Sequence, residues 1–216
     1  MSEQIRRVVV WSGWLRLAHW ALAGSALLLL ATGWLVAHAP SVAASAAEVH
    51  YLGAGVLVFA LALRVFLGFF GRGAERFEHL LPQRAEWRPM RDSLWFYLSL
   101  GRAPQPNWYA QNPLWKPIYL ALLLVLTLST VSGWLMPDRP LLGRVYLPQL
   151  HAWLADVVAW VTIAHLFSVI LQDVKGRHAD ISAMFSGSRF FSIEREGLVK
   201  PEVPRVSIHL DDIQRR

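Results

Sequence analysis

The sequence of 216 residues contains no cysteine. This absence excludes disulfide bonds, cysteine-ligated iron–sulfur clusters and a covalently attached c-type haem, which needs a Cys-x-x-Cys-His motif. Any metal centre must therefore use histidine, methionine or carboxylate ligands. A cleavable signal is also not expected, because the first apolar run is about as long as a membrane span and lacks a small-residue cleavage site.

Charged residues are scarce, at 17% of the chain, whereas 55% of the residues are hydrophobic and 11 are Trp. This composition is too apolar for an ordinary soluble domain. Four apolar segments reach the roughly 20 residues that a helix needs to cross a bilayer. They cover about Leu15–Ala37, Val42–Phe70, Leu114–Met136 and Leu150–Leu171. We therefore predict an all-α transmembrane four-helix bundle, because backbone groups in lipid must find partners within their own segment.

Basic residues are distributed very unevenly around these spans. Of the 21 Lys and Arg residues, 18 fall in the N-terminal flank, the second connection and the C-terminal tail. The first connection has none, and the third has only Arg139 and Arg144. Since basic residues favour the cytoplasmic side, we expect a multi-pass protein of the bacterial inner (cytoplasmic) membrane with both termini in the cytoplasm.

The predicted organisation is a membrane domain over residues 1–187 and a cytoplasmic tail over residues 188–216. The short connection His38–Ser41 makes the first two spans adjacent and antiparallel. The connection over residues 71–112 is long, and its stretch Trp87–Leu100 mixes Arg with aromatic residues, which predicts a short helix on the membrane surface. The polar tail is expected to be irregular.

A similar sequence pattern ends the first and the third span. The segment Ala31–Leu35 has the sequence ATGWL, and Val131–Leu135 has the sequence VSGWL. Small residues at these places allow a neighbouring helix or a flat ring to approach closely. Two interpretations stay open: specific packing against a cofactor ring, or ordinary small-residue packing beside an aromatic belt.

Four of the eight histidines lie within or at the ends of the predicted spans, where ionisable side chains are rare and usually functional. His151 and His165 are both in the fourth span. Their separation in sequence places them within roughly 40° of one helix face and about 21 Å apart along the axis. By depth in the membrane, His19 matches His165 toward the expected cytoplasmic side, and we call these two the inner pair. His50 matches His151 toward the other side, and these form the outer pair.

Two histidine pairs at two depths predict two haem groups, each bound by imidazoles from different helices. Iron with two axial imidazoles has no open position for oxygen, so the expected role is electron transfer across the membrane. The alternatives are a haem-free transporter or proton channel, and a membrane anchor with packing histidines. Solvated surface roles are expected for the other histidines, which are His38, His79, His178 and His209.

Two arginines are further candidate cofactor-binding residues. Arg64 follows His50 by 14 residues, so it shares that helix face and lies near the inner pair. It would contact a haem propionate or a quinone oxygen, or else snorkel to the cytoplasmic surface. Arg16 precedes His19 by about one turn and would bind a propionate or a lipid phosphate.

Four sequence features carry a resemblance to a known family. They are Arg16-x-x-His19-Trp20, Arg64-x-x-x-Gly68-Phe69-x-Gly71, Asn112-Pro113-Leu114 and the spacing between His151 and His165. Over roughly Val8 to Gly187, the chain resembles the bacterial cytochrome b561 and nickel-hydrogenase cytochrome b family. It is also similar to the cytochrome subunits of thiosulfate reductases and formate dehydrogenases. The resemblance implies four or five helices, two haems b and the same ligand pairs.

The resemblance also implies a function in a respiratory chain. The chain would be the electron-transfer subunit of an oxidoreductase that links membrane quinone, menaquinone or ubiquinone, to a redox partner. Gln111 and Asn112 are quinone candidates because amides in this region lie near the quinone in the formate dehydrogenase subunit. The alternative for them is a polar helix cap before Pro113.

The expected partners are membrane lipid, quinone, and a partner subunit or a periplasmic cytochrome c or iron–sulfur protein. A homo-oligomer and a hetero-oligomer are both compatible with the sequence, and no nucleic acid is expected. The main functional alternative is a stand-alone dihaem cytochrome b that works as a small quinone oxidoreductase.

Overall fold

Four long helices form the body of the protein in a computed structural model that describes residues 4–175 and 180–193. They are α1 (Gly13–His38), α2 (Ala43–Phe70), α4 (Trp115–Leu135) and α5 (Leu147–Lys175). Each is long and apolar enough to cross a membrane. The four predicted spans are thereby confirmed as helices, and α5 extends further at both ends than predicted.

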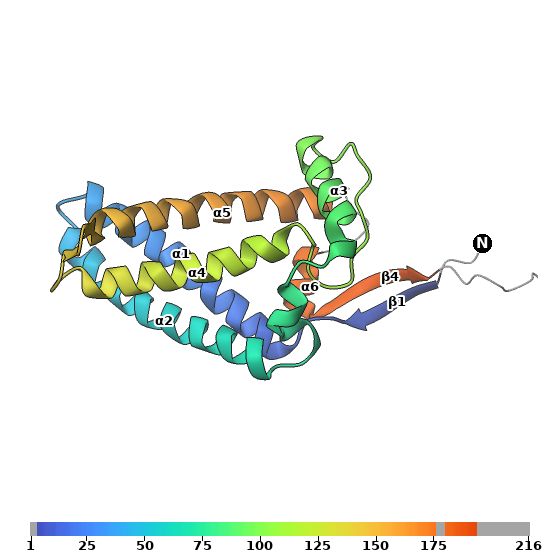
Figure 1. The fold of residues 1–216 in the computed structure, drawn as a ribbon, viewed down its shortest axis with the longest axis horizontal. Coiled ribbons are helices and arrows are strands. Elements are labelled where there is room, and N and C mark those ends of the chain that lie inside the picture. The colour runs from blue at the N-terminus through green and yellow to red at the C-terminus, as the bar shows by residue number, and fades with distance from the viewer. Residues whose placement is uncertain (1–3, 176–179, 194–216) are drawn as a thin grey trace, which may run out of the picture.

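The helices pack as two hairpins, with α1 against α2 and α4 against α5 (Figure 1). At the centre of the bundle, α2 contributes Leu57 and Leu61, which pack with Leu126 of α4 and Val158 of α5. Most other apolar side chains of the helices point outward and are exposed. Helices that are apolar all round are expected where the outer face contacts lipid rather than water.

The long connection between α2 and α4 folds into short helices at one end of the bundle. Three are single 3₁₀ turns: η1 (Gly73–Glu75), η2 (Phe77–Leu80) and η3 (Arg84–Glu86). They lead into α3 (Trp87–Leu98), which lies across the end of the bundle in Figure 1. The predicted helix over Trp87–Leu100 is confirmed, and it ends where the chain turns through the positive-φ residues Leu100 and Gly101.

A ribbon of two strands corrects the prediction of an irregular tail. β1 (Gln4–Val9) pairs antiparallel with β4 (Ser188–Ile193), and α6 (Asp180–Ser186) leads into β4. The ribbon extends from the same end of the bundle that carries α3 (Figure 1). Its two strands are far apart in the sequence, so no local pattern could reveal their pairing. The rest of the tail, residues 194–216, lies outside the described residues.

A second small sheet lies in the connection between α4 and α5. β2 (Leu141–Leu142) pairs antiparallel with β3 (Val145–Tyr146) around Gly143, whose φ of 62° suits glycine. The described part of the chain is therefore mostly helical with two small sheets, whereas the sequence predicted only helices.

The end of α2 is shaped to receive the turns that follow it. The buried Arg64 donates from Nη1 to the Glu75 carbonyl at 3.0 Å, and its guanidinium lies 5.0 Å from the centre of the Phe77 ring. A Cβ at Gly68 would lie 2.2 Å from that ring, and one at Gly71 would lie 2.5 Å from the Glu75 carboxylate. Arg64, Gly68 and Gly71 thus form the surface at the end of α2 against which residues 75–77 pack.

Replacing Gly68 with alanine should therefore destabilise the protein by about 1–3 kcal/mol, because the new methyl group displaces the Phe77 ring. Gly55→Ala is the matched control, since it lies in the same helix with nothing within 4 Å of its Cβ position. It should leave stability unchanged or raise it by up to about 1 kcal/mol. Thermal unfolding in detergent measures both, and equal midpoints for the two variants would refute this packing.

Candidate functional site

The four histidines of the spans meet as two pairs, one near each end of the bundle. His50 of α2 faces His151 of α5 with ring centres 6.3 Å apart. His19 of α1 and His165 of α5 have ring centres 6.3 Å apart as well. These are the partners that their depth in the spans predicted. Helix α5 thus contributes one histidine to each pair.

The ring of His151 is oriented by the end of α4. Its Nδ1 donates to the Ser129 carbonyl at 2.9 Å, and the Ser132 hydroxyl lies 3.2 Å from the same nitrogen. A Cβ at Gly133 would lie 2.9 Å from the His151 ring, so the ring packs directly on the α4 backbone. Because a carbonyl can only accept, Nδ1 carries the proton and Nε2 keeps a free lone pair.

The ring of His50 is oriented in the same way by the end of α1. Its Nδ1 lies 2.9 Å from the Thr32 hydroxyl. That hydroxyl donates to the Leu28 carbonyl at 2.8 Å, so it is available to accept from His50. A Cβ at Gly33 would lie 3.4 Å from the His50 ring. Nε2 of this histidine is again the nitrogen left with a lone pair.

The repeated sequence pattern has its explanation in these contacts. Thr32-Gly33 and Ser132-Gly133 take equivalent places in ATGWL and VSGWL. In each copy, the hydroxyl bonds to a histidine of the neighbouring helix and the glycine makes room for its ring. The small residues therefore pack specifically against imidazole rings. Sequence reasoning found the pattern but could not identify its partners.

The inner pair lies among aromatic side chains. His165 has the Trp115 ring at 5.5 Å and the Tyr119 ring at 6.1 Å between centres, and His19 has the Trp20 ring at 5.1 Å. Nδ1 of His19 and of His165 is buried without a hydrogen-bond partner in the described part of the chain. A buried polar atom of this kind normally has a partner, so these rings fit a site completed by a further group.

The separation of the rings fits a metal ion held between them. At an imidazole–metal distance of about 2 Å on each side, two rings on opposite sides of an ion have centres about 6 Å apart. Within residues 4–175 and 180–193, no three His, Asp or Glu residues form a metal-binding group. Each pair therefore offers two histidine ligands, with no third His, Asp or Glu ligand among the described residues. This donor set suits haem, whose macrocycle supplies the other ligands itself.

The two candidate arginines contact the protein near the inner pair. The Arg16 guanidinium donates to the Phe185 carbonyl of α6, and its Nε is buried with no partner among the described residues. Arg64 is 8% exposed and contacts the segment over residues 75–77 rather than reaching out to solvent. Among the described residues, no hydrogen bond joins either arginine to a paired histidine, so their roles toward a cofactor remain predictions.

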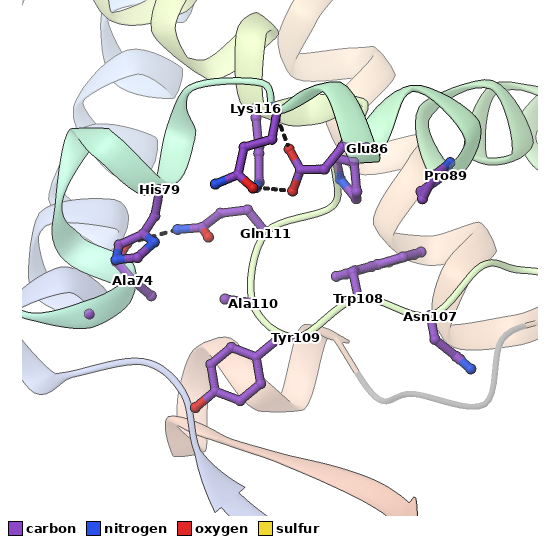
Figure 2. Close-up of a pocket in the computed structure, with 13 residues that line it drawn as sticks. Ala74, His79, Glu86, Pro89, Asn107, Trp108, Tyr109, Ala110, Gln111 and Lys116 are labelled. Carbon is purple, nitrogen blue, oxygen red and sulfur yellow. Dashed lines mark hydrogen bonds and ion pairs between the residues drawn. The ribbon is translucent and has the colours of Figure 1, made fainter.

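The two candidate amides separate in the structure. Asn112 is buried, donates to the Tyr97 hydroxyl at 2.8 Å and accepts from the Leu114 N–H at 3.0 Å, which closes a side-chain turn just before α4. Gln111 donates to the Ala74 carbonyl at 2.8 Å and lines a pocket of about 390 Å³, shown in Figure 2. Lys116 and His79 also line it, and no sequence pattern indicated that these residues share a pocket.

Comparisons with known proteins agree with this geometry. Residues 10–187 match the model of the family described as prokaryotic cytochrome b561. A probable Ni/Fe-hydrogenase B-type cytochrome subunit of Cupriavidus necator is 26% identical, covering 88% of this chain and 90% of the relative. The corresponding subunit of Azotobacter vinelandii is 24% identical, covering 90% of this chain and 94% of the relative.

No solved structure gives a significant match to the chain. The family match covers all four paired histidines and most of the sequence, and the resemblance seen in the sequence motifs is confirmed. The chain belongs to the prokaryotic cytochrome b561 family.

Proposed function

We propose that this protein carries electrons across the bacterial inner membrane through two haems b. His19 and His165 would ligate the inner haem, and His50 and His151 the outer one. The observation that supports this best is the presence of two ring pairs, each at 6.3 Å, toward opposite ends of the bundle. The haems would supply the redox chemistry, while the protein holds and orients them in an apolar surrounding.

The outer ligands are oriented by hydrogen bonds to Nδ1. Ser129 and Ser132 hold His151, and Thr32 holds His50, so that each Nε2 is the nitrogen available to iron. Partners of this kind fix ring orientation and raise the basicity of a ligand, and losing one typically costs about 10–100-fold in metal affinity. Arg16 and Arg64 lie at the inner end, where they would pair with haem propionates or a quinone oxygen.

Quinone exchange is proposed for the inner end, at the pocket that Gln111 lines. Trp115 is 6% exposed and packs its ring against His165, and the next residue, Lys116, lines the pocket. The start of α4 thus contacts both the pocket and His165, a proposed ligand of the inner haem. The substrate would be menaquinone or ubiquinone. Asn112 would stabilise this region through its hydrogen bond to the Tyr97 hydroxyl.

The partner is proposed to act at the outer end. Two relatives are named as subunits of Ni/Fe-hydrogenase, which favours a redox partner subunit for this chain as well. The basic residues favour cytoplasmic termini, so the outer haem would face a periplasmic protein with haem c or iron–sulfur clusters. The membrane domain would span residues 1–187, with the ribbon of β1 and β4 on the cytoplasmic side. A stand-alone quinone oxidoreductase is the alternative, and it predicts a protein that purifies without partner subunits.

Proteoliposomes test electron transfer across the membrane. With dithionite outside and ferricyanide trapped inside, the protein should carry electrons inward. His50→Ala and His151→Ala should each abolish transfer and remove the outer haem signal, while the inner haem is partly retained. His38→Ala is the control, because this exposed histidine contacts only Trp34 among the interactions described. Loss of the inner haem alone in the His50 variant would contradict the proposed pairing.

Gly133→Ala tests the packing of the outer site without removing a ligand. The added methyl group would lie 2.9 Å from the His151 ring and should push it off its position. We expect outer haem affinity to fall by about 10–100-fold, as for other supporting residues of metal sites. Gly24→Ala, with nothing within 4 Å, should bind haem normally. Spectroscopic haem titration measures both, and identical affinities would argue against this contact.

A further inference from the structure

The pocket at the inner end has a wall made by an ion pair. Lys116 of α4 donates from Nζ to the Glu86 carboxylate, and both side chains are mostly buried. The other carboxylate oxygen of Glu86 accepts from the Gln83 N–H at 3.1 Å. Both oxygens of Glu86 are therefore engaged, and the carboxylate is held in a fixed position. It forms a fixed part of the wall.

A second wall is the loop over residues 107–111, which the C-terminal ribbon holds in place. Arg189 of β4 is 2% exposed and donates from Nη1 to the Trp108 carbonyl at 3.1 Å and the Tyr109 carbonyl at 3.0 Å. Its guanidinium lies 5.7 Å from the centre of the Trp108 ring. Gln111 ties the end of the same loop to Ala74. Hydrogen bonds and an ion pair therefore hold both walls of the pocket in place.

The helix α3 connects this pocket to the apolar outer surface of the protein. Pro89, in the first turn of α3, lines the pocket. Four large side chains of α3 are exposed, and these are Trp87, Leu94, Trp95 and Leu98. An amphipathic helix with such a face lies at a membrane surface. An apolar ligand in the membrane would thus meet the pocket at the level of α3.

His79 is one of several pocket side chains that are also exposed at the protein surface. It lines the pocket, and its side chain is 49% exposed. Nε2 lies 3.6 Å from the carboxylate of Glu78, which is itself paired with Arg76 at 2.9 Å. Figure 2 shows His79 at the margin of the pocket, with the amide of Gln111 directed toward that margin. Histidine is the side chain best suited to exchange protons near neutral pH.

We propose that His79 is the catalytic residue that exchanges protons between water and a quinone bound in this pocket. The inference rests on the proposed quinone function, which supplies the electrons through the inner haem. On reduction, a quinone takes up two electrons and two protons. At the quinone oxygen that faces His79, the N–H bond of the imidazolium breaks and an O–H bond forms, and the neutral ring then regains a proton from water. The second oxygen, on the far side of the quinone ring, takes its proton from water. Quinol oxidation runs the same transfer in reverse.

Chemical rescue tests this role in the full haem-loaded protein. Turnover is measured with a short-chain quinol as donor and ferricyanide as acceptor. His79→Ala should lower turnover by about 100-fold, the lower range for loss of a general acid–base group. Added imidazole should restore turnover in a saturable way, because it fills the space left by the ring and exchanges protons. Reduction of both haems by dithionite should be unchanged, since His79 contacts no haem ligand among the described interactions.

Two further variants separate the outcomes. His79→Gln keeps a polar side chain but cannot exchange protons, so it should be slow and insensitive to imidazole. His38→Ala should resemble the unchanged protein with or without imidazole. Normal turnover in either His79 variant would overturn the role of His79, as would a loss in His79→Ala that imidazole does not restore. Either result would leave the proposed quinone function standing. A wild-type protein that dithionite reduces but quinol does not would overturn the quinone function and this inference with it.

Discussion

Each histidine pair is a constraint between two helices, and α5 takes part in both. To bind haem, His151 and His165 would have to face inward from α5, and each would require a partner at the same depth on another helix. The outer partner comes from α2 and the inner partner from α1. This requirement sets the rotation of three helices. The apolar core alone would not, because lipid-facing and core-facing side chains are equally apolar here.

The two ends of the bundle support their pairs in different ways. At the outer end, Thr32 and Ser132 bond to the rings, and two glycines let the rings approach the backbone. At the inner end, aromatic rings surround His165, and the adjoining polypeptide builds a pocket. The end of α2, the turns after it and the C-terminal ribbon all converge there. The outer end is shaped around its two histidine rings, whereas the inner end combines a histidine pair with a pocket.

Much of this architecture follows from local sequence patterns. Apolar runs predicted the four spans, and helical periodicity with depth predicted which histidines meet. The contacts that could not be predicted join residues that are not neighbours in the chain. They are the pairing of β1 with β4, the hydrogen bonds from Arg189 to the loop over residues 107–111, and the packing of the Phe77 ring against Gly68. Arg64 was correctly placed near the inner end, but its partner Glu75 lies in a turn that no periodic pattern marks.

The central claim is that one chain holds two haems through four histidines. The most direct measurement is the amount of haem b per polypeptide, from a pyridine haemochrome assay combined with quantitative amino-acid analysis of the purified protein. The account predicts two haems b per chain. A value of one would contradict one of the two histidine pairs, and a protein that binds no haem would contradict the account as a whole.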